Sequence, residues 1–329
     1  MKRTNYLFLF FGAGFFLLIS LLFLSAVRES EFKDKISALE KEMYALSQIN
    51  STPLPDKVDF CGETIALDRL DIRERFDREL TAFAYLHSTT MLYLKRANRF
   101  FPIIEPILKK NGIPDDFKYL CLIESNLDIR ALSPANAAGL WQFLESTGKS
   151  YGLEITSEVD ERYHIEKATE AACRYFNDAY SKFGSWINVA ASYNAGMAKI
   201  NSALATQQVN SALDLLLTSE TSRYVFRIVA IKQIFENPYL YGFVLSKENF
   251  YPPVSVQRVT INQTISDIAA FAKQYGLNYM QIKEYNPWLR DNKLTLDPGE
   301  TYEIAIPEKE DLYFNKNTIK IHDERWISK

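Results

Sequence analysis

Residues 114–126 read PDDFKYLCLIESN, a short apolar run that ends in a carboxylic acid. Pro114 is suited to the first turn of a helix, and the two aspartates after it complement the positive end of the helix dipole. On a helix, four residues of this run share one face at positions i, i+3, i+4 and i+7, namely Phe117, Leu120, Cys121 and Glu124. The stretch therefore predicts a helix whose core-facing side also carries a carboxyl group.

The place of Glu124 on that face predicts an unusual environment for its side chain. Apolar surroundings disfavour the charged form of a carboxyl group, so they raise its pKa and favour the protonated acid near neutral pH. An acid of this kind can donate a proton to a glycosidic oxygen, as in lysozyme. The pattern alone leaves open the alternative that Glu124 sits at the helix end and turns to solvent.

Helical spacing of apolar residues continues on both sides of this run, from Asp71 to about Glu236. Turn signals interrupt it at residues 111–112, 133–134, 148, 152 and 183–184. We therefore expect an all-α domain around Glu124.

The overall composition is that of a folded protein without a basic surface. The 329 residues are 47% hydrophobic and 14% aromatic, which argues against a disordered chain. The formal net charge of -3 provides no electrostatic footprint for nucleic acid. The length favours two folded units plus an N-terminal segment.

The cysteines and histidines show no metal-ligand spacing, so no metal site is expected. Cys61, Cys121 and Cys173 include no Cys-x-x-Cys pair. Cys121 and Cys173 lie in apolar helical patterns, which favour buried thiols over a disulfide or a reactive role. His87 continues an apolar stripe that begins at Phe76, so we expect a core histidine.

The N-terminal segment predicts a membrane anchor. Residues 6–27 follow Lys2 and Arg3 and contain no charged side chain, which is enough to span a hydrocarbon layer of about 30 Å. Positive charges before the span favour an N-terminus in the cytoplasm and place the rest of the chain outside it. A cleaved signal peptide is the alternative.

Residues 28–60 are expected to form a stalk and a linker. Their apolar residues have the spacing of a heptad seam over about two heptads, at Phe32, Ile36, Leu39, Met43 and Leu46. This leaves open a single amphipathic helix or a weak dimer through residues 32–46. Pro53 and Pro55 then end any helix.

Four short blocks, in order along the chain, carry a family resemblance. They are Ile123-Glu124-Ser125-Asn126, Ala138-Gly139-Leu140-Trp141-Gln142-Phe143, Ala191-Ser192-Tyr193-Asn194-Ala195-Gly196 and Glu220-Thr221-Ser222-Arg223-Tyr224-Val225. Together they resemble the lytic transglycosylases with a goose-type-lysozyme-like fold. The membrane-bound lytic murein transglycosylase D type is the most similar, since it shares Trp141 and a stretch like Asp160-Glu161-Arg162-Tyr163. Ser192 replaces an alanine of the family pattern.

The resemblance implies an enzyme that cleaves peptidoglycan between N-acetylmuramic acid and N-acetylglucosamine and leaves a 1,6-anhydromuramyl end. It implies that Glu124 is the single acid/base and that no cofactor takes part. It further implies that the substrate is bound by Ser125, Gln142, Tyr193, Asn194 and Tyr224. Peptidoglycan glycan strands are then the partner, and a cell-envelope location follows, with the anchor in the inner membrane and the catalytic domain in the periplasm.

Ordinary glycosidases use two carboxylates, and the sequence offers no clear partner for Glu124. The neighbouring acids are more simply solvated charges, namely Asp128, Glu145, Asp160 and Glu161. Two alternatives stay open, a lysozyme-type hydrolase of the same bond and a non-catalytic peptidoglycan-binding protein.

The pattern changes after a proline- and aromatic-rich stretch that ends near residue 253. Alternation predicts strands over Val256–Ile261 and Tyr302–Ile306, and helices are predicted over Ser266–Tyr275 and Met280–Tyr285. This βααβ order resembles a LysM module, which binds glycans that contain N-acetylglucosamine. A small α/β domain that only packs on the catalytic unit is the alternative.

The sequence therefore predicts a mainly α protein with a small βααβ domain after the helical one. The predicted ranges are 1–27 for the transmembrane anchor or signal segment, 28–60 for the stalk and linker, 61–250 for the lysozyme-like domain, 255–307 for the LysM-like domain and 308–329 for a tail without an assigned function. The proline-rich boundary favours a LysM-like domain that can be removed without loss of the catalytic one.

Overall fold

The computed structural model describes residues 24–25, 27–43 and 50–327, and the chain divides into two compact units, Met1–Ser51 and Thr52–Lys329. In the first unit residues 27–43 are helical, and the predicted seam residues up to Met43 are exposed. No helix within the described ranges is both long and apolar enough to cross a membrane. Most of the predicted span, residues 6–27, and Leu46 of the seam lie outside the described residues.

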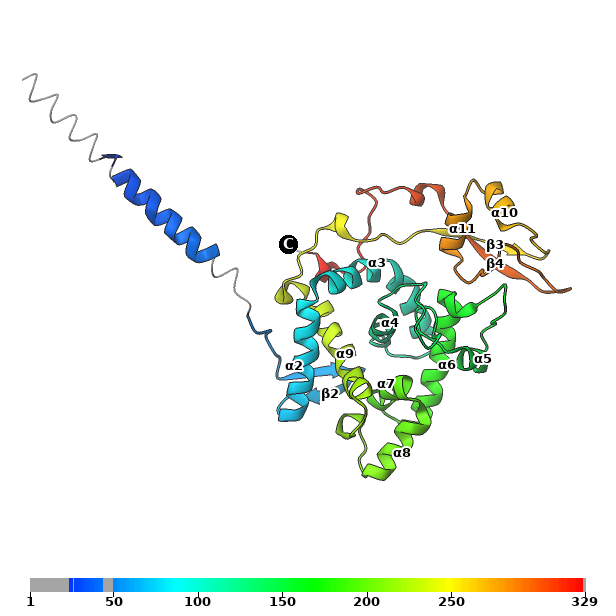
Figure 1. The fold of residues 1–329 in the computed structure, drawn as a ribbon, viewed down its shortest axis with the longest axis horizontal. Coiled ribbons are helices and arrows are strands. Elements are labelled where there is room, and N and C mark those ends of the chain that lie inside the picture. The colour runs from blue at the N-terminus through cyan, green and yellow to red at the C-terminus, as the bar shows by residue number, and fades with distance from the viewer. Residues whose placement is uncertain (1–23, 26, 44–49, 328–329) are drawn as a thin grey trace, which may run out of the picture. The chain divides into compact units, whose positions relative to one another are not determined.

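The second unit is mainly helical with two small antiparallel sheets (Figure 1). Its strands are β1 (Lys57–Phe60), β2 (Glu63–Ala66), β3 (Val256–Ile261) and β4 (Tyr302–Pro307). Its α-helices are α2 (Leu70–Tyr85), α3 (His87–Lys110), α4 (Phe117–Ser125), α5 (Glu145–Ser150), α6 (Ile165–Phe183), α7 (Trp186–Ala195), α8 (Met197–Gln207), α9 (Ser219–Glu236), α10 (Ile268–Gln274) and α11 (Tyr279–Tyr285). Short 3-10 helices are η1 (Glu161–Tyr163), η2 (Ala212–Asp214), η3 (Pro238–Tyr241), η4 (Lys247–Asn249), η5 (Lys309–Leu312) and η6 (Glu324–Trp326).

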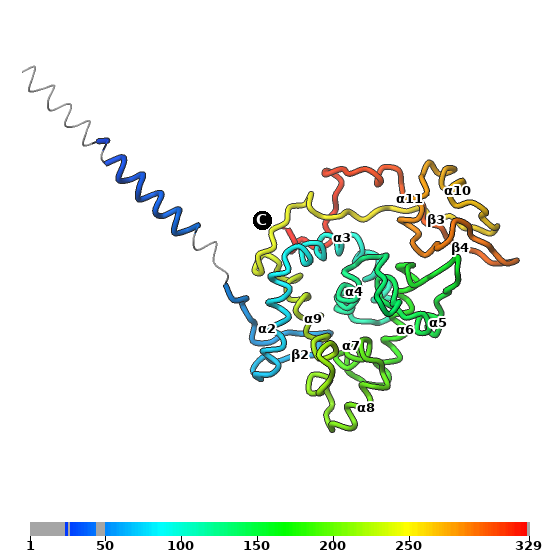
Figure 2. The backbone as a smooth tube through the Cα atoms, in the orientation of Figure 1, coloured from blue at the N-terminus to red at the C-terminus, as the bar shows by residue number. Residues whose placement is uncertain are grey.

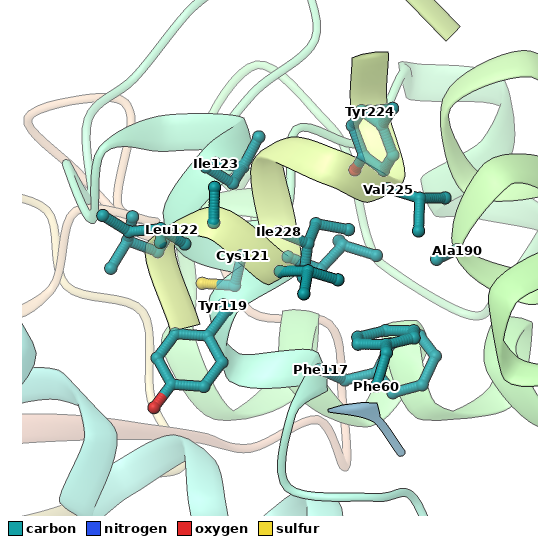
Figure 3. Packing of buried hydrophobic residues seen from close by; sticks show 14 of the residues in the cluster. Phe60, Phe117, Tyr119, Cys121, Leu122, Ile123, Ala190, Tyr224, Val225 and Ile228 are labelled. Carbon is teal, nitrogen blue, oxygen red and sulfur yellow. The ribbon is translucent and has the colours of Figure 1, made fainter. Parts of the chain in front are cut away.

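Helix α4 is enclosed by the rest of the helical domain. Every residue from Phe117 to Ile123 is buried, so the helix is covered on all sides and not only on the predicted face. Figure 3 shows Phe60 and Phe117 side by side, with ring centroids 5.5 Å apart, next to Val225 and Ile228 of α9. Because an isolated helix of this length is marginal in water, tertiary packing must hold it.

The first turn of α4 differs from the prediction. The helix begins at Phe117, and the chain from Pro114 to Asp116 forms a turn before it. The Asp116 carboxylate accepts hydrogen bonds from the Cys61 backbone N–H and the Lys232 ammonium group, each 2.7 Å long. This carboxylate therefore ties the β1–β2 turn and α9 to the start of α4.

Strands β1 and β2 form a hairpin that the sequence analysis did not predict. Cys61 and Gly62 make its two-residue turn with φ angles of 56° and 83°, as a type I′ turn requires. Val58 and Phe60 belong to the helical core. The compact unit begins at Thr52, so it includes this hairpin as well as the predicted domain from residue 61.

Two further predictions are wrong because helices begin or end at residues other than those predicted. Helix α2 ends at Tyr85 and α3 begins at His87. His87 is therefore exposed at the start of a new helix and does not lie in the core. Gly148, predicted in a turn, lies inside α5, where an added Cβ would be 3.2 Å from Ile155 Cδ1. Cys121 and Cys173 are buried free thiols, as predicted.

The βααβ order of the C-terminal module is confirmed. Strands β3 and β4 pair along their full lengths, from Val256 opposite Pro307 to Ile261 opposite Tyr302. Both helices lie within two residues of their predicted ends. The module has its own core, which includes Ile268, Ile282, Trp288, Leu294 and Ile304.

After this module the chain returns to the helical domain. Trp326 is buried in the helical core, where its Nε1 donates to the Phe235 carbonyl at 3.1 Å. On α3, the buried Asn98 amide donates to the carbonyls of Tyr251 and Lys320, at 3.1 Å each. Figure 2 shows these outgoing and returning stretches passing α3. Removal of everything after residue 255 would therefore also remove Trp326 from the helical core.

We expect Trp326→Ala to lower the free energy of unfolding by about 3–5 kcal/mol, the usual cost of removing a buried large aromatic side chain. Urea titration of the purified chain measures this loss. Tyr313→Ala is the matched control, because Tyr313 is an aromatic residue of the same tail that is 72% exposed. Equal unfolding midpoints for the two variants would contradict a structural role for the tail.

Candidate active site

Glu124 lies in the last turn of α4, half-buried, where helix α3 fixes the helix end. After Ser125 the chain turns at Asn126, which has a left-handed backbone with φ of 56°. The Tyr93 hydroxyl donates to Asn126 Oδ1, and the Arg96 guanidinium donates to the Asn126 carbonyl at 2.9 Å. These two contacts hold the position from which the Glu124 side chain extends.

The Tyr224 hydroxyl donates a hydrogen bond to Glu124 Oε1. Tyr224 is buried on α9, 100 residues further along the chain. Burial raises the pKa of Tyr224 well above its ordinary value, and the Glu124 charge adds to the rise. The phenol therefore stays protonated and remains a donor to the carboxyl group.

Burial raises the pKa of Glu124 from its ordinary value of 4.5 to about 7. The hydrogen bond from Tyr224 and the positive charge of Arg227 act against this rise, while the charge of Glu220 adds to it. Since desolvation prevails, the acid and the carboxylate coexist near neutral pH. This is the property that a group needs to donate and recover a proton at that pH.

Tyr193 contacts both the segment 138–143 and the surroundings of Glu124. Its hydroxyl donates to the Trp141 carbonyl at 2.6 Å, and its ring lies 6.1 Å from that of Phe143. Burial raises the pKa of Tyr193 well above its ordinary value, and the charge of Glu124 contributes to the rise. Tyr193, Tyr224 and Glu124 therefore form one cluster drawn from α7, α9 and α4.

The other three predicted binding residues are Ser125, Gln142 and Asn194. The buried Ser125 hydroxyl donates to the Cys121 carbonyl within α4. The Gln142 amide nitrogen donates to the Gly139 carbonyl at 2.8 Å, and Asn194 is half-buried near the end of α7. Within the described residues, no hydrogen bond joins any of these three side chains to the Glu124 carboxyl group.

The carboxylates considered as partners for Glu124 are engaged elsewhere. Asp128 accepts from the Arg130 N–H, Glu145 pairs with Lys149, Asp160 with Arg162 and Glu161 with Lys167.

Two charged neighbours of Glu124 were not predicted as site residues. Glu220 and Arg227 lie on α9 one turn before and one turn after Tyr224, and both act on the Glu124 carboxyl group. The sequence could have indicated them, because Glu220 lies four residues before Tyr224 and Arg227 three residues after it, which places all three on the same side of the helix.

Two parts of the chain match known protein families. Residues 101–214 match the family model of the transglycosylase SLT domain. Residues 257–310 match that of the soluble lytic transglycosylase C-terminal LysM-like domain. The chain is therefore similar to a transglycosylase SLT domain over residues 101–214 and to a LysM-like domain over residues 257–310.

One similar protein is the membrane-bound lytic murein transglycosylase D of Escherichia coli (strain K12). The two are 30% identical over 243 residues, which cover 72% of this chain and 52% of that protein, so this chain spans about half the length of its relative.

Two solved structures are also similar. The 70 kDa soluble lytic transglycosylase SLT70 from Escherichia coli shares 20% identity, with a TM-score of 0.39 over 52% of this chain and 30% of that one. The lytic transglycosylase Slt from Pseudomonas aeruginosa shares 18%, with a TM-score of 0.33 over 41% and 23%.

The raised pKa predicts how Glu124→Gln changes stability with pH. The folded protein keeps a proton on Glu124 up to about pH 7, whereas the unfolded chain releases it near pH 4.5. The stability contributed by this proton is complete below pH 4.5 and is lost as the pH rises through 7. Glutamine does not titrate, so the variant should gain on the order of 1–3 kcal/mol over the parent between these pH values.

Urea unfolding at pH 4.5 and pH 8 measures this gain. Glu145→Gln is the control, because the exposed pairing with Lys149 lowers the pKa of Glu145, so this variant should show no such gain. A difference between Glu124→Gln and the parent that is the same at both pH values would contradict the raised pKa.

Proposed function

We propose that this chain is a peptidoglycan lytic transglycosylase with Glu124 as its single acid/base. The observation that carries the proposal is the half-buried Glu124, whose pKa is about 7 and whose carboxyl group accepts from Tyr224, in a chain with a transglycosylase SLT domain. The substrate is the glycan strand, cleaved between N-acetylmuramic acid and N-acetylglucosamine.

In the first step Glu124, as the acid, donates its proton to the glycosidic oxygen, and the bond from that oxygen to C1 of the muramic residue breaks. In the second step the carboxylate accepts the proton of the C6 hydroxyl of the same muramic residue while that oxygen bonds to C1. A 1,6-anhydro ring forms, Glu124 regains its proton, and no water is consumed. The nucleophile belongs to the substrate, so attack is intramolecular and a second carboxylate is unnecessary.

We assign supporting roles by position. Tyr224 orients the Glu124 carboxyl group through its hydrogen bond, and Tyr193 lies beside that group and contacts the sugar. Gln142 and Asn194 bind the sugar from the loop before α5 and the end of α7. Ser125, whose hydroxyl bonds within α4, supports the site through the helix end.

The flanking segments complete the proposal. The LysM-like domain binds N-acetylglucosamine-containing glycan, and the uncharged run of residues 6–27 holds the chain in the inner membrane with its catalytic domain in the periplasm. A weak dimer through residues 32–46 would bury the exposed apolar side chains of the helix at 27–43.

Glu124→Gln should lose catalysis by a factor on the order of 10²–10⁴, because the amide keeps the size of the side chain but cannot transfer the proton. Mass spectrometry of peptidoglycan digests measures the loss and identifies the reaction, since anhydro ends and reducing ends differ by one water. Products with reducing ends would instead identify a hydrolase. Absence of cleavage by the folded parent would indicate a binding protein.

Tyr224→Phe should lower turnover and move its pH dependence. The proposed reaction starts from protonated Glu124, so kcat/KM should fall as the pH rises through about 7. The hydrogen bond from Tyr224 lowers the pKa of Glu124, so its removal should shift this fall to higher pH. Stability should change by only about 1 kcal/mol.

Tyr175→Phe is the matched control, because it also removes a buried hydroxyl, one that donates to the Ser192 carbonyl. The control should lose stability without a shift of the pH profile. An unshifted profile in Tyr224→Phe would remove this residue from the proposed mechanism.

A further inference from the structure

The stretch Asp160-Glu161-Arg162-Tyr163 has no part in the proposed chemistry, yet it contains a buried ion pair. The Arg162 guanidinium donates Nε to Asp160 Oδ1 at 2.9 Å and Nη2 to Asp160 Oδ2 at 2.7 Å. Both side chains are only 9% exposed. Burying two charges costs free energy that a pair seldom repays in stability, so such a pair calls for another reason.

Arg162 holds the loop that carries Gln142. Its Nη1 donates to the Asn136 carbonyl at 2.8 Å and to the Phe143 carbonyl at 3.2 Å, at the two ends of the loop. Between them Gly139, with φ of 74°, lies so close that an added Cβ would be 1.8 Å from the Arg162 carbonyl oxygen. The loop 136–143 is thus seated on Arg162 at three points.

The same loop reaches the reacting group. The Trp141 carbonyl accepts the hydrogen bond of the Tyr193 hydroxyl, and Tyr193 lies close enough to Glu124 to respond to its charge. A displacement of the loop would therefore move Tyr193 as well as Gln142.

On its other side, Asp160 is bonded to the LysM-like module. The Asp160 N–H donates to the Trp288 carbonyl at 2.9 Å, and the Arg290 N–H donates to the Glu158 carbonyl at 2.7 Å. These bonds make an antiparallel bridge between the two domains at Val159 and Leu289.

Side chains reinforce this bridge. The Glu158 carboxylate accepts from the Thr295 N–H at 2.7 Å and hydroxyl at 3.1 Å, and it pairs with Lys293. Val159 and Tyr163 belong to the core of the module and not to that of the helical domain. The segment beneath Arg162 is therefore folded as part of the LysM-like module.

We propose that the LysM-like module is a positioning part of the active site and acts through Arg162, which sets the loop 136–143. This inference rests on the proposed function. The module holds residues 158–160, Asp160 orients Arg162, and Arg162 holds the loop that supports Gln142 and Tyr193. Catalytic groups misplaced by a fraction of an ångström lose rate without losing the fold.

The first test is Arg162→Lys, which keeps the charge but loses the planar fork that reaches Asp160 and two carbonyls at once. On short soluble glycan fragments kcat should fall about tenfold or more, while KM and binding to insoluble peptidoglycan change little. The folded parent, assayed together with Glu124→Gln, serves as the reference for activity. Equal cleavage by the parent and Glu124→Gln would refute the proposed function. The effect of the module is judged separately, from kcat of Arg162→Lys relative to the parent.

The second test covers the case in which Arg162→Lys does not fold. Glu158→Ala removes the side-chain contacts with Thr295 and Lys293 and touches neither the loop nor Arg162. We expect a smaller fall in kcat with unchanged KM, and partial recovery in Glu158→Gln, which keeps an acceptor for the Thr295 N–H. Glu170→Ala is the matched control, because it removes bonds to Lys110 and Asn111 away from the module.

Two results would overturn the inference. One is a parent-like kcat in folded Arg162→Lys and Glu158→Ala. The other is a loss in Glu158→Ala that appears only in KM or in binding to insoluble peptidoglycan, since the module would then act only by holding substrate.

Discussion

The enclosure of a nine-residue helix on every side is the constraint on which the rest of this structure depends. Because α4 is too short to be stable alone, its neighbours must surround it, and they bring Tyr224 from α9 and Tyr193 from α7 to its end. The same enclosure withdraws water from Glu124 and raises its pKa to about 7. Packing and acidity therefore have one cause.

The polar contacts around α4 show how this enclosure is secured. Asp116 fixes the start of the helix to the hairpin turn and to Lys232, while Tyr93 and Arg96 fix its end through Asn126. Such bonds determine direction more than they add stability, since each is worth only about 1 kcal/mol net. They fix the position of the Glu124 carboxyl group, while the apolar contacts supply most of the free energy of folding.

Much of this arrangement could be predicted from local patterns. The spacing of Phe117, Leu120 and Cys121 predicted the helix and the side on which Glu124 lies, and alternation predicted β3 and β4 closely. The features that were not predicted depend on contacts between residues far apart in the sequence. Cysteine is no turn signal, so the hairpin at Cys61 was missed. No local pattern indicates that Trp326 packs into the helical core and bonds to Phe235, 91 residues earlier. The bridge between the domains uses backbone groups, which any sequence has.

Asn98 gives the LysM-like module a particular mechanical character. Its one amide group binds the chain at Tyr251, before the module, and at Lys320, after it, so both connections to the module are anchored on α3. A module on a flexible linker raises local concentration by searching a volume, whereas this one is anchored to the helical domain on both sides. Under the proposed function, a glycan strand bound to the module would therefore be held at a fixed offset from Glu124, and a pull on it would be borne by α3 and by the bridge at Val159 and Leu289.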